Sequence, residues 1–130
     1  MLTDVQIESF KSATDLSANV FKFVRMTADR TVAVHTALAQ VTVGVQQNKP
    51  TWNATDSVSG TIDVKHAGRT SVFASGVVAV GNKVAPTAAG LARVAASGDH
   101  VAGIATTASD GTAAQPMIDI IMTLGGAPLP

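Results

Sequence analysis

The sequence predicts a mainly β protein: a compact β-barrel or sandwich built from two similar β units, with at most one or two short helices. Short apolar runs recur along the chain, separated by turn residues at intervals of about 8–12 residues. Apolar residues make up 46% of the chain and aromatic residues only 4%, so aliphatic side chains must form most of the core. A chain of 130 residues can bury such a core within one domain.

An internal repeat is the reason for expecting two units. An apolar run interrupted by Gly44 is followed by an Ile-Asp-Val run centred on Asp63. A second apolar run, interrupted by Gly103, is followed by an Ile-Asp-Ile run centred on Asp119. The two glycines are 59 residues apart, so each unit is long enough to hold several strands. A glycine inside a strand predicts a bulge or the close approach of another backbone.

Residues 1–18 are predicted to form an N-terminal arm, followed by a single β domain at 19–130. The segment Thr3–Gln6 fits a helix capping box, whereas the apolar residues nearby also alternate as a strand requires. Helix and strand therefore both remain open for this arm. Either structure would have one apolar side, and we expect three of its side chains to contact a partner: Val5, Ile7 and Phe10.

From Asn19 onward the pattern favours strands, because β-branched and aromatic residues suit a pleated, half-buried surface. We expect strands at 20–24, 31–34, 41–45, 58–65, 71–73, 91–95, 101–105 and 117–122. The segment Lys49–Asn53 is predicted to be a loop, since proline has no donor for a strand ladder. Gly81–Asn82 predicts a turn in the run that opens the second unit.

Helix is expected to be scarce. The alanine-rich stretch 85–96 contains Pro86 and Gly90, which disfavour a long helix there. A short helix remains open in the connection 105–115 and in the matching connection 46–57.

Composition and charge argue against several classes of partner. Nine basic and nine acidic residues cancel to a net charge of zero, whereas nucleic acid or an anionic membrane requires a basic face. A weakly charged surface favours association, so we expect protein partners or subunits. The chain has no cysteine, no apolar run of the roughly 20 residues that cross a bilayer, and no signal-peptide pattern. We therefore expect it to be made in the cytoplasm.

The residues able to carry chemistry form no recognised pattern. His35, His66 and His100 lack metal-site spacing, and solvated strand ends or turns are the favoured interpretation for them. Asp63 and Asp119 occupy matching positions, which suits outward-facing strand residues better than a general acid–base pair. The sequence contains no nucleophile elbow and no phosphate-binding glycine loop. We expect no enzymatic activity, no metal and no cofactor.

Trp52 is the one tryptophan of the chain and lies in a polar stretch. Tryptophan is enriched at the energetic centres of protein interfaces, so Trp52 is a candidate contact with a partner. The alternative, that Trp52 caps the end of the barrel, has equal weight at this point.

Short glycine-containing motifs follow one another in a fixed order between residues 19 and 123. They are Lys22–Val24, Asp29–Val34, Val43–Val45, Val64–Gly68, Gly81–Val84, Gly90–Val94, Val101–Ala105 and Ile118–Ile121. In order and spacing they resemble the small capsid decoration (cement) proteins of tailed bacteriophages, with Asn82 where that family often has aspartate. The resemblance implies a homotrimer that binds the major capsid protein on the outer surface of the virion and cements neighbouring capsomers.

The resemblance thus predicts a structural virion protein. Residues 1–17 do not match the family well, and we expect them, from their apolar side, to be one capsid contact, with Trp52 and its loop as another. Two alternatives remain open. One is another β-rich virion component, such as a head-fibre base or a tail module. The other is a carbohydrate-binding module that stacks a sugar on Trp52.

Overall fold

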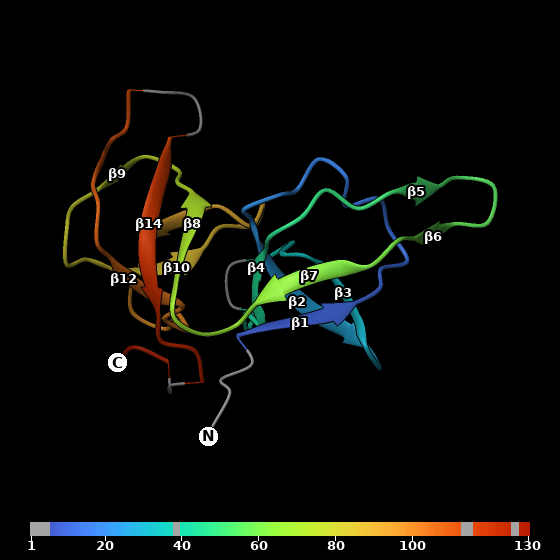
Figure 1. Cartoon of the computed structure of the whole chain (residues 1–130). Helices are drawn as coiled ribbons and strands as arrows, with labels where there is room; N and C mark the ends of the chain where they lie inside the picture. The colour runs from blue at the N-terminus through green and yellow to red at the C-terminus, as the bar shows by residue number, and fades with distance from the viewer. Residues whose placement is uncertain (1–5, 38–39, 113–115, 126–127) are drawn as a thin grey trace, which may run out of the picture.

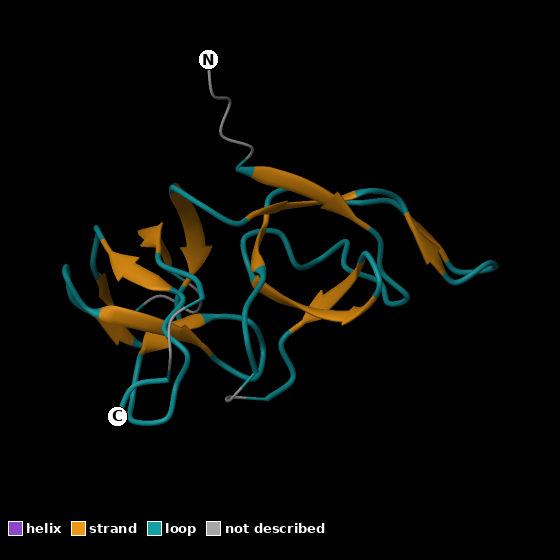
Figure 2. Ribbon diagram, turned by 90° about the horizontal axis from the view of Figure 1, so that it is seen from below, coloured by secondary structure: helices purple, strands orange, loops and turns teal. Residues whose placement is uncertain are grey.

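The computed structural model describes residues 6–37, 40–112, 116–125 and 128–130. These residues form fourteen β-strands and no helix, so none of them belongs to a helix that could cross a membrane. The strands make two five-stranded antiparallel sheets and two two-stranded ladders. Figure 1 shows the two larger sheets beside each other, and Figure 2 shows the same two bodies from below, joined by loops. The predicted all-β class is confirmed.

The first sheet has the strand order β1-β7-β4-β2-β3. Its strands are β1 (Ile7–Phe10), β2 (Phe23–Ala28), β3 (Thr31–Val34), β4 (Gly44–Gln46) and β7 (Ile62–Lys65). The connection from β4 to β7 carries the ladder of β5 (Trp52–Asn53) with β6 (Val58–Ser59). Along β7 buried Ile62 and Val64 alternate with more exposed neighbours, which is the pattern of a strand with one face on a core.

The second sheet has the strand order β11-β10-β12-β14-β8. Its strands are β8 (Arg69–Phe73), β10 (Lys83–Pro86), β11 (Ala92–Val94), β12 (Gly103–Ala105) and β14 (Met117–Met122). A separate ladder joins β9 (Val77–Val78) to β13 (Ser109–Asp110). The alanine-rich stretch is part of this sheet, as β10 and β11, and is not helical.

The internal repeat of the sequence is a repeat of structure. Both sheets have the same order when β1, β7, β4, β2 and β3 are matched with β8, β14, β12, β10 and β11. The register agrees as well: Val24 pairs with Val34 and with Gly44, and at the matching position Val84 pairs with Val94 and with Gly103. The chain is therefore two copies of one supersecondary unit.

The paired glycines allow two strands to approach closely. A Cβ atom on Gly44 would collide with the backbone oxygen of Lys65 on β7. A Cβ atom on Gly103 would lie 2.7 Å from the backbone oxygen of Ile121, the matching atom on β14. Both glycines have negative φ, so the requirement is for space and not for a left-handed backbone.

Each sheet curls until its two edges meet at one bridge, between Lys11 and Thr31 in the first unit and between Ala74 and Ala92 in the second. Because one isolated bridge and no continuous ladder joins these edges, neither sheet is a closed barrel, and the arrangement is consistent with the predicted sandwich. Each unit has its own hydrophobic cluster. The first consists of Leu16, Val24, Val32, Ile62 and Val64, and the second of Phe23, Val45, Val72, Ala74, Val78, Val84, Ala92, Ala102, Ala105, Ile118, Ile120 and Met122.

Two residues of the first sheet complete the core of the second. Phe23 and Val45 belong to β2 and β4, yet both are fully buried in the second cluster. The backbone N–H of Phe23 donates to the oxygen of Gly90 (2.8 Å), and that of Phe73 donates to the oxygen of Phe21 (3.0 Å). The segment 21–23 therefore fills the gap between β8 and β11 and joins the two units.

The described part of the predicted N-terminal arm is built into the first sheet. Residues 7–10 form β1, in which Ile7 pairs with Lys65 and Phe10 with Ile62. Leu16 is 1% exposed and lies in the first core. The structure thus selects the strand over the helix for this segment, and residues 1–5 lie outside the described part of the chain.

Several predicted boundaries are wrong. The loop predicted at 49–53 ends early, because Trp52 and Asn53 form β5. The strand predicted at 58–65 is divided into β6 and β7 around Gly60, where a Cβ would approach Thr51 Oγ1 to 2.6 Å. The strand predicted at 20–24 begins only at Phe23, because Phe21 adopts a φ of 60°. The described residues of connections 46–57 and 105–115 contain no helix.

Candidate functional site

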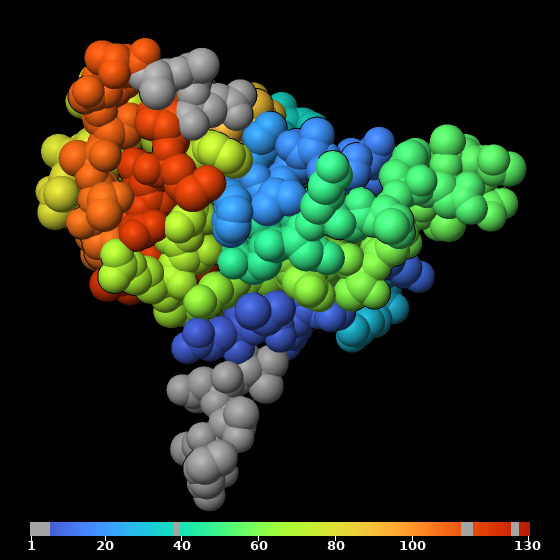
Figure 3. Space-filling model, turned by 45° about the horizontal axis from the view of Figure 1, so that its top comes forward, coloured from blue at the N-terminus to red at the C-terminus, as the bar shows by residue number. Residues whose placement is uncertain are grey.

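The β5–β6 hairpin projects from the body of the protein. Figures 1 and 3 show it extending beyond the first sheet, well away from the second unit. Trp52 pairs with Ser59 and Asn53 with Val58, and neither strand belongs to a five-stranded sheet. The N–H of Gly60 donates to the oxygen of Thr51 (2.8 Å) at the base of the hairpin. A two-stranded hairpin has little core of its own, so its shape depends on local hydrogen bonds.

Polar bonds organise the tip of this hairpin. Asn53 Oδ1 accepts from the N–H of Thr55 (3.0 Å) and from that of Asp56 (3.2 Å). Asn53 Nδ2 donates to Asp56 Oδ2 (3.1 Å), and Ser57 has a φ of 53°. This side-chain turn fixes the loop without help from either core.

The hairpin presents two apolar side chains. Trp52 is half-buried and belongs to neither hydrophobic cluster, and Val58 is 51% exposed. The matching connection of the second unit folds back instead, with Ser109 and Asp110 paired to β9 and Ser109 Oγ donating to the oxygen of Gly76 (2.9 Å). The two repeats thus differ here: one connection is held against its sheet, and the other presents an indole outside both sheets.

The two described residues of the predicted N-terminal contact lie in different surroundings. Ile7 is 47% exposed on the edge strand β1. Phe10 packs against the first hydrophobic cluster, so its ring is used within the fold. Val5 lies outside the described residues. Of the two described side chains of this predicted set, Ile7 is the more exposed, and Phe10 is partly buried.

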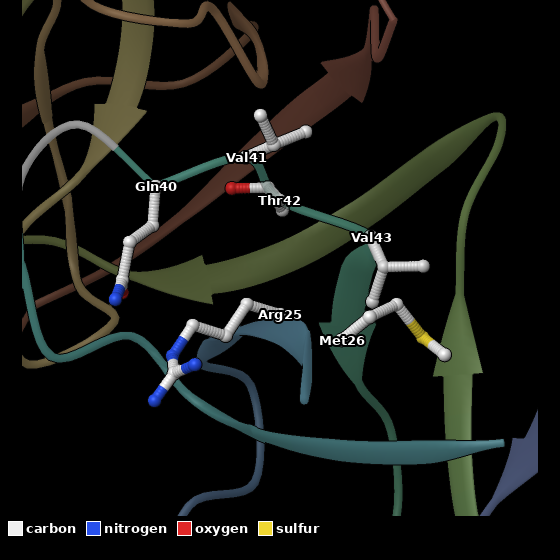
Figure 4. A pocket seen from close by; sticks show the side chains of 6 residues that line it. All are labelled: Arg25, Met26, Gln40, Val41, Thr42 and Val43. Carbon is white, nitrogen blue, oxygen red and sulfur yellow. The ribbon is translucent and has the colours of Figure 1, made fainter. Parts of the chain in front are cut away.

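A hollow of about 390 Å³ lies between β2 and the segment 40–43. Arg25, Met26, Gln40, Val41, Thr42 and Val43 line it. In Figure 4 the Arg25 and Gln40 side chains converge on one side, and Met26 and Val43 lie together on the other. The lining holds one cation, two other polar side chains and no carboxylate or imidazole, so it supplies a surface for contact and no acid–base pair.

The interpretation of the histidines as solvated strand ends or turns is wrong for His35, which is 1% exposed. His35 is buried and shares a 2.9 Å hydrogen bond with Thr42 Oγ1. Burial, reinforced by the nearby Arg25 charge, lowers the pKa of His35 to about 4, so the ring is neutral near pH 7. His66 Nε2 lies 3.9 Å from Glu8 Oε1 near the surface. No three metal-binding side chains of the described residues cluster together.

The two matching aspartates accept hydrogen bonds from serines on the edge strands β1 and β8. Ser9 Oγ donates to Asp63 Oδ1 (3.1 Å) across β1 and β7, and Ser71 Oγ donates to Asp119 Oδ1 (2.7 Å) across β8 and β14. The Ser71 bond, followed by that of Arg69, lowers the pKa of Asp119 below its usual value. Each aspartate belongs to its own sheet, so the structure does not bring them together as a pair.

Comparison with protein-family models found no match for this chain, and comparison with curated proteins found none either.

Sequence reasoning missed the hairpin, although the sequence holds a signal for it. Pro50 suggested a loop for the whole of 49–53. The polar cluster Asn53–Ser57 between Trp52 and Val58 is, however, typical of a turn between two short strands. Pro50 precedes the first of these strands and so does not interrupt the ladder.

Proposed function

We propose that this chain is a structural protein of a phage head, which binds the outer surface of the capsid as a homotrimer and cements neighbouring capsomers. The observation that carries the proposal is a two-unit β body with one projecting hairpin that presents Trp52 and Val58. The motif series of the sequence is the second support, because it resembles the decoration proteins in order and spacing.

The physical logic requires binding surfaces only. A protein that binds the assembled shell more tightly than loose subunits stabilises the shell by mass action. A trimer presents three hairpins to a lattice of repeating sites, and linked contacts of this kind gain about 10²–10⁴ in avidity. A single contact of modest strength is therefore enough for high occupancy.

The hairpin is the proposed capsid contact, together with Ile7 at the edge of the first sheet. Trp52 offers a large, rigid contact surface at low cost in side-chain entropy, which is why tryptophan is frequent at interface centres. Residues 1–5 remain a predicted contact, with Val5 among them. Phe10, which is partly buried against the first hydrophobic cluster, also remains a predicted contact.

The test is occupancy on undecorated heads of the phage that encodes the chain. Purified protein is mixed with heads, the heads are sedimented, and bound chain is counted per major capsid protein. Trp52→Ala is expected to weaken binding at least about 30-fold, the size of an interface hot spot. Thr55→Ala on the same hairpin is the control, because only the backbone N–H of Thr55 takes part in the turn.

Unchanged occupancy of the Trp52→Ala variant would remove the hairpin from the contact. No binding by the wild-type chain, combined with saturable binding to a sugar that Trp52→Ala abolishes, would replace the proposal with the carbohydrate-binding alternative. Deleting residues 1–5 tests the remaining arm without removing β1 or Leu16, both of which the first sheet needs.

A further inference from the structure

Three hollows adjoin one another along the segment 40–43, which precedes β4. Val41 and Thr42 line all three of them. The first is the hollow of about 390 Å³ beside β2 that is described above. The second, of about 370 Å³, reaches Glu8 on β1, and the third, of about 140 Å³, reaches His100 in the second unit. We call this continuous surface the 40–43 trough.

Arg25 is the one polar side chain of the first hollow that has no partner among the described residues. Gln40 Oε1 accepts from the N–H of Thr36 (2.9 Å), and Thr42 Oγ1 shares a hydrogen bond with His35. Arg25 forms no ion pair with a described residue, and its Nε atom is buried without a hydrogen-bond partner. A half-buried guanidinium in this state lacks the compensation that a paired anion gives. The charge of Arg25 is therefore available to a ligand.

Aliphatic side chains surround this cation. Met26 is 43% exposed and Val41 is 59% exposed, and Figure 4 shows Met26 beside Val43 in the first hollow. The aliphatic lining continues into the other hollows with Val101 and Leu124. Val41 belongs to no strand and to neither hydrophobic cluster. A surface of this kind fits a ligand that has both a negative charge and aliphatic groups.

From these contacts we infer that the 40–43 trough binds an extended segment of a protein partner, with a carboxylate on Arg25 and aliphatic side chains on Met26 and Val41. A carboxylate suits a guanidinium because the two groups can form parallel, charge-assisted hydrogen bonds. Glu8 is the one carboxylate in the described lining of the three hollows, and it lies in a different hollow from Arg25. The trough is thus positive at one end and negative at the other, which orients the acidic residue of the partner toward Arg25.

The extent of the trough favours a polypeptide as the occupant. Its lining comes from β1, from β2 and from the second unit, whereas a small carboxylate would contact the first hollow alone. Alternate side chains of an extended chain point to the same face, so its aliphatic residues can enter successive hollows. No residue of the β5–β6 hairpin lines the trough, and this inference goes beyond the proposed function without resting on it.

Peptide binding to the whole chain tests the inference. The probes are acetyl-Leu-Thr-Leu-Glu amide, its analogue acetyl-Leu-Thr-Leu-Gln amide, and isovalerate, which is a free aliphatic carboxylate. Binding is followed by NMR, from the backbone amide signals of the isotope-labelled chain. The acidic peptide is expected to shift the signals of Arg25, Met26 and residues 41–43. The glutamine peptide is expected to bind at least about 10-fold more weakly, the size of a hydrogen bond between charged groups.

Two variants, each with a matched control, test the contacts. Arg25→Gln is expected to bind both peptides equally weakly, and its control Lys49→Gln removes the same charge from an exposed residue outside the trough. Val41→Glu is expected to weaken binding of the acidic peptide at least about 10-fold, because two carboxylates would then lie close together. Its control is Val80→Glu: Val80 is 65% exposed, and neither valine belongs to a strand. Thermal unfolding shows whether each variant is folded, and Val41→Glu gives the test if Arg25→Gln does not fold.

The inference is overturned if the acidic peptide shifts no signal of the trough at millimolar concentration, or if the wild-type chain binds the two peptides equally. An equal loss of binding in Val41→Glu and Val80→Glu would also overturn it. Isovalerate that binds as tightly as the acidic peptide would exclude the polypeptide as the occupant. Peptide binding by a chain that does not bind heads would support this inference and contradict the proposed function.

Discussion

Replacing Gly44 with alanine is expected to destabilise the fold by about 3 kcal/mol, the upper end of the cost of overfilling a packed site. The new Cβ would collide with the backbone oxygen of Lys65 and lie 2.6 Å from Val64 Cγ1, both on the neighbouring strand β7. A backbone oxygen cannot rotate away as a side chain can, so β4 and β7 must separate. Gly103→Ala is expected to cost about as much, since its obstacle is the matching oxygen of Ile121 at 2.7 Å.

Thermal unfolding measures this cost directly. The entropy of unfolding is about 2 cal/mol/K per residue, so about 3 kcal/mol corresponds to a fall in Tm of about 11 °C for a chain of this length. Gly76→Ala is the control: Gly76 has a φ of 83° but nothing within 4 Å of an added Cβ. The left-handed backbone alone costs about 1 kcal/mol, or roughly 4 °C. If Gly44→Ala unfolds no earlier than Gly76→Ala, the close approach of β4 and β7 is not what requires glycine.

Three further predictions concern stability. Gly90→Ala is expected to cost about 3 kcal/mol, because a Cβ there would lie 2.8 Å from the oxygen of Phe23 at the joint between the units; urea unfolding should show a lower midpoint. Asp99→Asn is expected to cost about 2 kcal/mol, because it weakens two charged hydrogen bonds to a mostly buried Arg93 (2.7 and 2.8 Å). The pKa of His35 is lowered to about 4 in the folded chain against a reference of 6.5, so the unfolded chain binds the proton more readily. The His35 contribution is complete above about pH 6.5 and is lost as the pH falls toward 4, by at most about 3 kcal/mol.

The pH prediction has a clear control. His35→Gln removes the titrating group and keeps a side chain able to bond Thr42, so its stability should vary less than that of the wild type between about pH 6.5 and 4. The carboxylates with lowered pKa values, among them Asp99 and Asp119, lose their contributions only as the pH falls further. If the stability of the wild type and that of the variant change equally with pH over this range, His35 is not the cause of the loss of stability.

The repeat could be predicted because its signal is local. A glycine within a run of β-branched residues, followed by an Ile-Asp strand, specifies both a close backbone approach and one buried face. The same signal led to Asp63 and Asp119 as outward-facing residues, and the structure shows each bonded to a serine on the neighbouring strand.

The joint between the units could not be predicted from such patterns. Val45 and Ile104 occupy matching places in short strands of similar composition, yet Val45 is fully buried and Ile104 is 36% exposed. The difference is that Val45 packs against the second unit, whereas no part of the described chain covers Ile104 in the same way. Strand alternation does not show what packs on the outer face of a sheet. The positive φ of Phe21, which turns the chain into the joint, is likewise a tertiary effect on a residue that ordinarily avoids it.

The β5–β6 hairpin could be predicted only in part. Its turn residues are readable from Asn53–Ser57, but its projection is not. The matching connection of the second unit folds back through Ser109 and Gly76, and nothing in local propensity separates the two outcomes. The hairpin residues proposed for binding thus belong to neither five-stranded sheet.

If the chain is the proposed decoration protein, cryo-electron microscopy of the virions that carry it tests the central claim most directly. The account predicts density for the two-unit body across the outer capsid lattice, with the β5–β6 hairpin against the major capsid protein. Density confined to a tail or to a fibre base, or particles that lack the chain altogether, would contradict it.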